Sequence, residues 1–144
     1  MKLKPEILET IRTAHTIAVV GLSSNPARPS YGVARYLQSQ GYRIIPVNPG
    51  ERTVLGETAF PSLDAIPDTL RPVDIVDVFR RSQFVPDIVE QAIGLGARLL
   101  WLQEGVSHAG AEARAHQAGM QVVSDACLLK AHGRFVRPEA VPQS

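Results

Sequence analysis

Residues 17–31 bring together groups that could hold a phosphate. An apolar, largely β-branched run at residues 17–20 ends at Gly21 and gives way to a polar loop and then to a helical pattern. Backbone N–H groups at such a helix start can face a phosphate. Only the first glycine of a G-x-G-x-x-G fingerprint is present, and the loop instead carries hydroxyl and guanidinium groups: Ser23, Ser24, Arg28 and Ser30. The loop therefore predicts a phosphorylated ligand that need not be NAD.

The residues after the second and third expected strands point the same way. An NAD-binding unit usually has Asp or Glu after its second strand to hold the ribose hydroxyls, whereas this chain has Asn48, which lacks that charge. Arg52 could suit a ribose phosphate, and Arg80 and Arg81 offer guanidinium donors for bidentate phosphate contacts. The pattern predicts a ligand with several phosphates that is not plain NAD.

Each of these residues also has a plainer interpretation. Ser30 could only cap a helix, Arg28 could be a solvated charge, and Asn48-Pro49 could be a simple turn. Arg80 and Arg81 could be an exposed pair. Their common location favours a ligand role, provided that the strands lie where the pattern predicts.

Five strands alternate with helices along the chain. We expect strands at 16–22, 42–47, 73–79, 98–102 and 120–123, and helices at 5–14, 30–40, 82–95 and 107–118. This alternation predicts a single α/β domain with a doubly wound, mostly parallel five-stranded sheet, Rossmann-like, with helices on both faces. The carboxyl ends of all strands then meet at one edge, where ligands bind in open sheets.

Composition and charge argue against several classes of function. A chain of 144 residues with 44% apolar and 20% charged residues fits one globular domain, and its net charge of +1 argues against nucleic acid or an anionic membrane as partner. No apolar run reaches the length of a membrane span, and we see no secretory signal. The single Cys127 suits a reducing cytoplasm, where we expect the protein. The four histidines show no zinc spacing and are expected to be surface or loop residues.

Six short motifs carry a family resemblance. They are AVVGLS with RPSY in the first loop, PVNP, LGE, VDIVDVFRR, WLQEG and the late Cys127. In this order and spacing the chain resembles the small CoA-binding proteins with a Rossmann-like fold, which are similar to the N-terminal domain of the succinyl-CoA synthetase α subunit. The resemblance covers residues 5–130. We therefore expect a CoA-binding domain at 1–130 and a loosely held polar tail at 131–144.

The resemblance also implies how the ligand lies. The first loop would hold the CoA diphosphate, residues 48–49 and 79–80 would flank the nucleotide end, and residues 103–105 and Cys127 would lie toward pantetheine. The predicted ligand contacts are Gly21, Leu22, Ser23, Ser24, Arg28, Ser30, Tyr31, Asn48, Pro49, Phe79, Arg80 and Gln103.

The leading hypothesis is a protein that binds CoA or an acyl-CoA without catalytic machinery of its own. No general acid–base or nucleophile–base pair stands out, and the segment with the synthetase's phosphorylated histidine is absent from the sequence. Three alternatives remain. Cys127 could exchange with the CoA thiol, although Ala126 replaces the Arg expected before it. Arg52 favours an NADP-dependent reductase. The protein could also act as a regulatory subunit, with a protein partner or as a homodimer.

Overall fold

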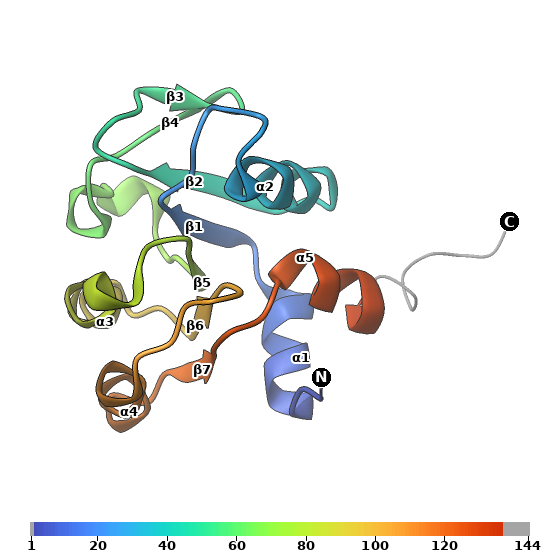
Figure 1. Ribbon diagram of the computed structural model, residues 1–144, viewed down its shortest axis with the longest axis vertical. Helices are drawn as coiled ribbons and strands as arrows, with labels where there is room; N and C mark the ends of the chain where they lie inside the picture. The colour runs from blue at the N-terminus through green and yellow to red at the C-terminus, as the bar shows by residue number, and fades with distance from the viewer. Residues whose placement is uncertain (1, 137–144) are drawn as a thin grey trace, which may run out of the picture.

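A parallel five-stranded sheet forms the centre of the molecule (Figure 1). The computed structural model describes residues 2–136. The strands are β1 (Thr16–Val20), β2 (Arg43–Val47), β5 (Ile75–Val78), β6 (Leu99–Leu102) and β7 (Gln121–Val123). Their order is β2-β1-β5-β6-β7, and every neighbouring pair is parallel. The predicted fold class, a doubly wound Rossmann-like sheet in one domain, is confirmed.

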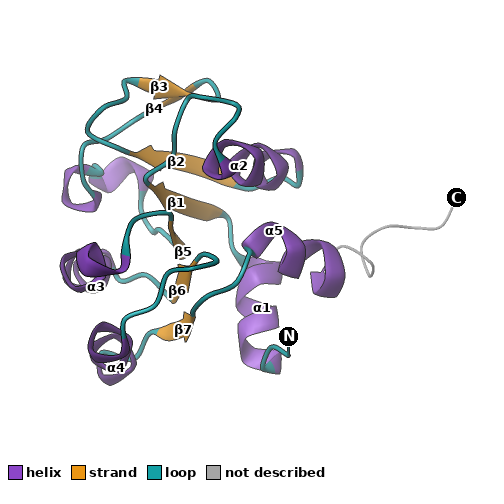
Figure 2. Cartoon of the chain, viewed as in Figure 1, coloured by secondary structure: helices purple, strands orange, loops and turns teal. Residues whose placement is uncertain are grey.

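Helices cover both faces of this sheet (Figure 2). The helices are α1 (Pro5–Thr13), α2 (Pro29–Ser39), α3 (Val85–Leu95), α4 (Ala109–Gln117) and α5 (Leu128–Ala131). Helices α3 and α4 pack on one face, while α1, α2 and α5 pack on the other. No helix within residues 2–136 has both the length and the apolar character needed to cross a membrane.

The strands are apolar because both of their faces are covered, as a parallel sheet with helices on each side requires. All five residues of β1 are buried, and so are all four of β5 and of β6. Asp77 is the one charged residue of these three strands, and its side chain on the central strand β5 is 0% exposed. Asp74 and Asp77 break strict alternation in the sequence of this segment, a pattern that predicts partial cover on both faces, and the burial of all four β5 residues agrees with it.

The sequence of residues 51–72 predicts an irregular stretch with one short helical turn after Ser62, and a small hairpin occupies part of it. It consists of β3 (Thr53–Val54) and β4 (Glu57–Thr58), which pair in antiparallel fashion beyond the end of β2. The predicted helical turn after Ser62 is present as a 3-10 turn over Leu63–Ala65. A hairpin of two-residue strands leaves too short an alternation to be recognised in a sequence.

The chain remains ordered past residue 130, where we placed the start of the tail. A short π-helical segment, His132–Val136, continues α5, and both its first and last residues are buried. The expectation that His132 is a surface or loop residue is wrong: it is 5% exposed, its Nδ1 lies 2.8 Å from the hydroxyl of Tyr36, and its ring meets Tyr42 edge-on. The rest of the predicted tail, 137–144, lies outside the described residues.

Candidate functional site

A cavity of about 660 Å³ opens at the carboxyl edge of the sheet. It lies between the ends of β1 and β5, where the chain's winding reverses direction, and this switch point is where open α/β sheets bind ligands. Its volume falls in the usual range for small-molecule sites. All five segments that follow strands contribute to its wall: Gly21, Ser23, Arg28, Pro29, Ser30, Val33, Asn48, Phe79, Arg80, Arg81, Gln103, Glu104, Gly105, Val106 and Cys127.

Gly21 allows the first loop to pass close to the end of β5. Its φ is +86°, and a Cβ there would lie 2.7 Å from the carbonyl oxygen of Phe79. Its N–H donates to the carbonyl of Val47 at 2.8 Å, which joins the ends of β1 and β2. No side chain fits this position, so glycine is required to shape the floor of the cavity.

The loop after Gly21 satisfies many of its own backbone donors. The N–H of Ser23 donates to Ser30 Oγ at 3.1 Å, and the N–H of Asn25 donates to Ser23 Oγ at 3.0 Å. Ser30 is therefore not the helix cap that one interpretation suggested, since α2 begins at Pro29 and Ser30 is buried in its first turn. Because these N–H groups already donate within the loop, an anion would instead bind at the start of α2 and to side chains.

Two further residues hold the first loop against the segment after β2. Asn48 donates through Nδ2 to the carbonyl of Leu22 at 3.1 Å and accepts the N–H of Gly50 at 2.9 Å. Glu51 accepts both the N–H and the hydroxyl of Ser24 through Oε2, at 2.8 and 3.0 Å. Asn48 thus forms a turn and positions the loop. Sequence reasoning missed Glu51, because nothing in its local pattern indicates a contact 27 residues away.

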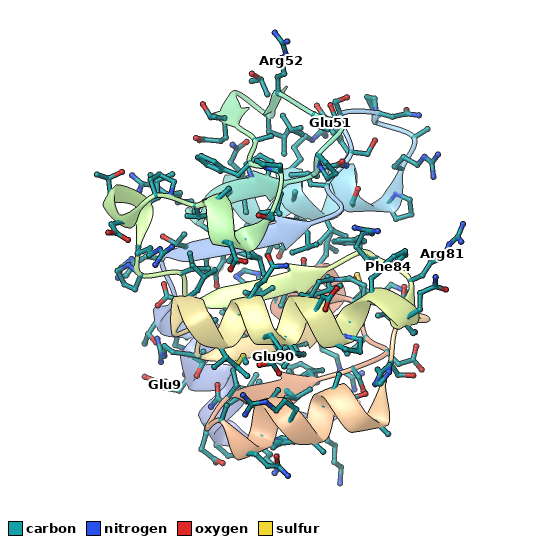
Figure 3. All side chains as sticks on the ribbon, turned by 90° about the vertical axis from the view of Figure 1, so that its left-hand side faces the viewer. Glu9, Glu51, Arg52, Arg81, Phe84 and Glu90 are labelled. Carbon is teal, nitrogen blue, oxygen red and sulfur yellow. The ribbon has the colours of Figure 1, made fainter. Side chains whose placement is uncertain are left out.

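Positive charge collects on one side of the cavity. Arg28, Arg80 and Arg81 all line it, and none forms an ion pair with another residue in the described part of the chain. The Arg80 guanidinium lies 4.1 Å from the centre of the Phe84 ring, and Arg81 extends into solvent beside Phe84 (Figure 3). Uncompensated guanidinium groups in a concave site attract an anion.

The opposite side of the cavity has no such excess of positive charge. The carboxylate of Glu104 is paired with Lys130 Nζ at 3.0 Å. Behind Glu104, the amide Nε2 of Gln103 donates to Asp77 Oδ1 at 2.6 Å, and both side chains are buried. Burial raises the pKa of Asp77 to about 7, and the hydrogen bond from Gln103 works in the opposite direction. The sequence did not single out Asp77 as a site residue.

Cys127 lies at the far end of this side, buried and as a free thiol. The preceding residue, Ala126, accepts the indole N–H of Trp101 at 2.9 Å. Trp101 is 0% exposed, so it is a core residue that anchors the chain before Cys127 rather than a platform for a ligand.

The cavity gathers most of the predicted contacts. It is lined by Gly21, Ser23, Arg28, Ser30, Asn48, Phe79, Arg80 and Gln103. Four predicted contacts lie outside its lining. Leu22 is fully buried, Ser24 binds Glu51, Pro49 is exposed, and Tyr31 lines a separate hollow on α2.

The positions of Arg52 and Arg81 relative to the cavity differ from what we expected. Arg52 is exposed just before β3 and points outward at the top of Figure 3, and it does not line the cavity. The feature that favoured an NADP-dependent reductase is thus removed from the site. Arg81, which our set of predicted contacts left out, does line the cavity.

A doubly wound parallel sheet with a cationic cavity at its switch point defines a Rossmann-like α/β domain. Within that class, residues 15–133 match the model of the CoA binding domain family, and the chain belongs to that family. The resemblance inferred from the sequence motifs is confirmed.

The chain is also similar to individual proteins over nearly its whole length. The chain is 40% identical over 129 residues to the uncharacterized protein YneT of Bacillus subtilis (strain 168), a match that covers 90% of this chain and 93% of YneT. A solved structure of a hypothetical protein from Pyrococcus horikoshii OT3 matches with a TM-score of 0.86 and 35% identity, and 93% of each chain is covered.

A longer relative is similar over part of its length only. The alpha subunit of the ADP-forming acetate–CoA ligase II of Pyrococcus furiosus is 28% identical over 123 residues. That match covers 78% of this chain and 26% of the subunit.

Proposed function

We propose that the protein binds CoA or an acyl-CoA in the cavity at the switch point, without catalysing a reaction on it. The observation that carries the proposal is a group of three arginines, Arg28, Arg80 and Arg81, which line the cavity with the start of α2 and form no ion pair within residues 2–136. CoA carries a diphosphate and a 3′-phosphate, which matches several guanidinium groups better than one phosphate would. The family description supports the same ligand.

The charge distribution suggests how CoA would lie. Its phosphates would bind at the arginines and the start of α2, where the helix dipole also favours an anion. Its uncharged pantetheine arm would cross toward Gln103 and Cys127, where Lys130 already neutralises Glu104.

Thermal unfolding with added ligand tests the proposal. At a CoA concentration of about 100 times the dissociation constant, binding adds about 2.7 kcal/mol to the free energy of unfolding. For a domain of this size the melting temperature should rise by about 5–10 °C. A clear shift with NADP and none with CoA would refute the proposal.

A charge-matched pair of variants adds specificity to this test. Arg80→Gln should reduce the shift with CoA, whereas Arg35→Gln should not, because Arg35 is exposed on α2 and does not line the cavity. Equal effects of the two substitutions would show that general surface charge, not the cavity, attracts the ligand.

Thiol exchange is a second candidate, favoured by the position of Cys127 in the wall of the same cavity. The Cys127 thiolate would attack CoA disulfide, forming a bond to one CoA sulfur and releasing the other as CoA thiolate. Intact mass spectrometry with CoA disulfide should then show one added CoA that a reductant removes. An unmodified mass would end this candidate. The cytoplasmic location and a protein partner remain predictions.

A further inference from the structure

Asp77 is an unusual residue for its position. It lies on β5 between Val19 of β1 and Trp101 of β6, on the apolar face covered by α1, α2 and α5. Burying a carboxyl group in such surroundings is costly, and an apolar residue would usually serve stability better. The packing of the sheet therefore gives no reason for an acid here.

Within residues 2–136, a single hydrogen bond connects Asp77 to the wall of the cavity. Its Oδ1 accepts from Gln103 at 2.6 Å, and its Oδ2 has no partner within residues 2–136. Asp74 accepts the backbone N–H groups of residues 15 and 16, whereas Asp77 accepts none from the backbone of residues 2–136. Its one hydrogen bond within the described residues is with Gln103, whose side chain lines the cavity.

This contact fixes the direction of the Gln103 amide. Because Nε2 donates to Asp77, the side-chain carbonyl must lie on the other side of the planar amide group. Gln103 Oε1 has no hydrogen-bond partner among the described residues, and it is not among the atoms sealed from solvent. Since Gln103 lines the cavity, a held acceptor is available there.

We propose that Asp77 is a positioning residue, which holds the Gln103 amide so that Oε1 accepts a hydrogen bond from an amide N–H of the pantetheine arm. The proposal rests on the proposed function. A carbonyl oxygen beside Glu104 suits a donor rather than a phosphate, and the arm of CoA contains two amide N–H groups. Without Asp77 the Gln103 amide could rotate. Binding would then have to fix its orientation, and this entropy cost would weaken the affinity for CoA.

Titration calorimetry with two ligands tests the role of Asp77. The ligands are CoA and adenosine 3′-phosphate 5′-diphosphate, which keeps every phosphate of CoA but lacks the arm. Asp77→Val should weaken CoA binding about 10-fold and leave the nucleotide within about 2-fold, since one hydrogen bond is lost. Asp77→Asn, which keeps an oxygen acceptor for Gln103, should restore CoA binding.

A second variant tests the acceptor itself and keeps Asp77 in place. Gln103→Met preserves the approximate shape of the side chain, and it should also weaken CoA binding about 10-fold while sparing the nucleotide. The double variant should bind CoA no more weakly than either single one, because both remove the same contact.

The results separate this proposal from the proposed function. If the wild-type protein binds neither ligand, the proposed function fails and the role of Asp77 fails with it. If the wild type binds CoA and Asp77→Val binds it equally well, only the positioning role is refuted. Equal weakening of CoA and the nucleotide by Asp77→Val would also refute it, since that result indicates a general structural effect.

Discussion

The buried Asp77 should make the stability of the protein depend on pH in a way that can be measured. Its pKa is raised from 3.8 to about 7 in the folded state, because burial disfavours the charged carboxylate. Between these two values the folded protein holds a proton that the unfolded chain has released. Stability from this group is therefore fully present at acidic pH and is lost as pH rises toward 7.

The size of this loss follows from the change in pKa. A change of about three units, at about 1.4 kcal/mol per unit, corresponds to about 4 kcal/mol between pH 4 and pH 8. Asp77→Asn removes the ionisation and keeps the shape. The free energy of unfolding of the variant minus that of the wild type should therefore rise by about 4 kcal/mol over this range. Any constant cost of the buried amide cancels in the comparison.

Urea unfolding at one-unit steps from pH 4 to pH 8 measures this difference directly. The matched control is Asp64→Asn, since Asp64 is exposed on the surface. A difference for Asp77→Asn that stays flat within about 1 kcal/mol would show that the carboxyl group is solvated, and the reasoning would be refuted.

Three other substitutions test the architecture of the cavity. Gly21→Ala should cost about 2 kcal/mol or more of unfolding free energy, measured in urea, because the residue has a φ of +86° and its Cβ would meet a carbonyl at 2.7 Å. Arg28→Gln should weaken CoA binding about 10-fold and lower its salt dependence in calorimetry, whereas Arg35→Gln should change neither. Ser30→Ala should lower the unfolding free energy by about 1–3 kcal/mol, since it leaves the N–H of Ser23 without its acceptor; an unchanged urea midpoint would contradict that bond.

The fold could be predicted from the sequence because its signals are local. Apolar runs alternate with amphipathic segments, and glycines such as Gly41 and Gly96 end two of the helices. Once five parallel strands are assigned, the handedness of the connections brings their carboxyl ends together. That is why the segments that follow all five strands line one cavity, although no single motif was specific.

Other features of the structure could not be predicted, because they depend on contacts between residues far apart in the sequence. His132 is buried against Tyr36, almost 100 residues earlier in the chain, with its Nδ1 2.8 Å from the Tyr36 hydroxyl. Glu51 reaches Ser24 only after the sheet has brought their loops together. Asp77 was recognised as a break in alternation, but its connection to the cavity through Gln103 needs the register between β5 and β6.

The first loop explains why this site depends on side-chain charge. In a G-x-G-x-x-G loop, the second glycine lets the backbone approach a diphosphate closely. Here the hydroxyl oxygens of Ser23 and Ser30 accept backbone N–H groups of the loop itself, so these donors are already used. The loop is consequently held in shape before a ligand arrives, and attraction for an anion passes to Arg28 and Arg80 and to the start of α2. Because guanidinium groups on long side chains adapt to more than one phosphate position, such a site suits a ligand whose phosphates are spread over both the diphosphate and the ribose.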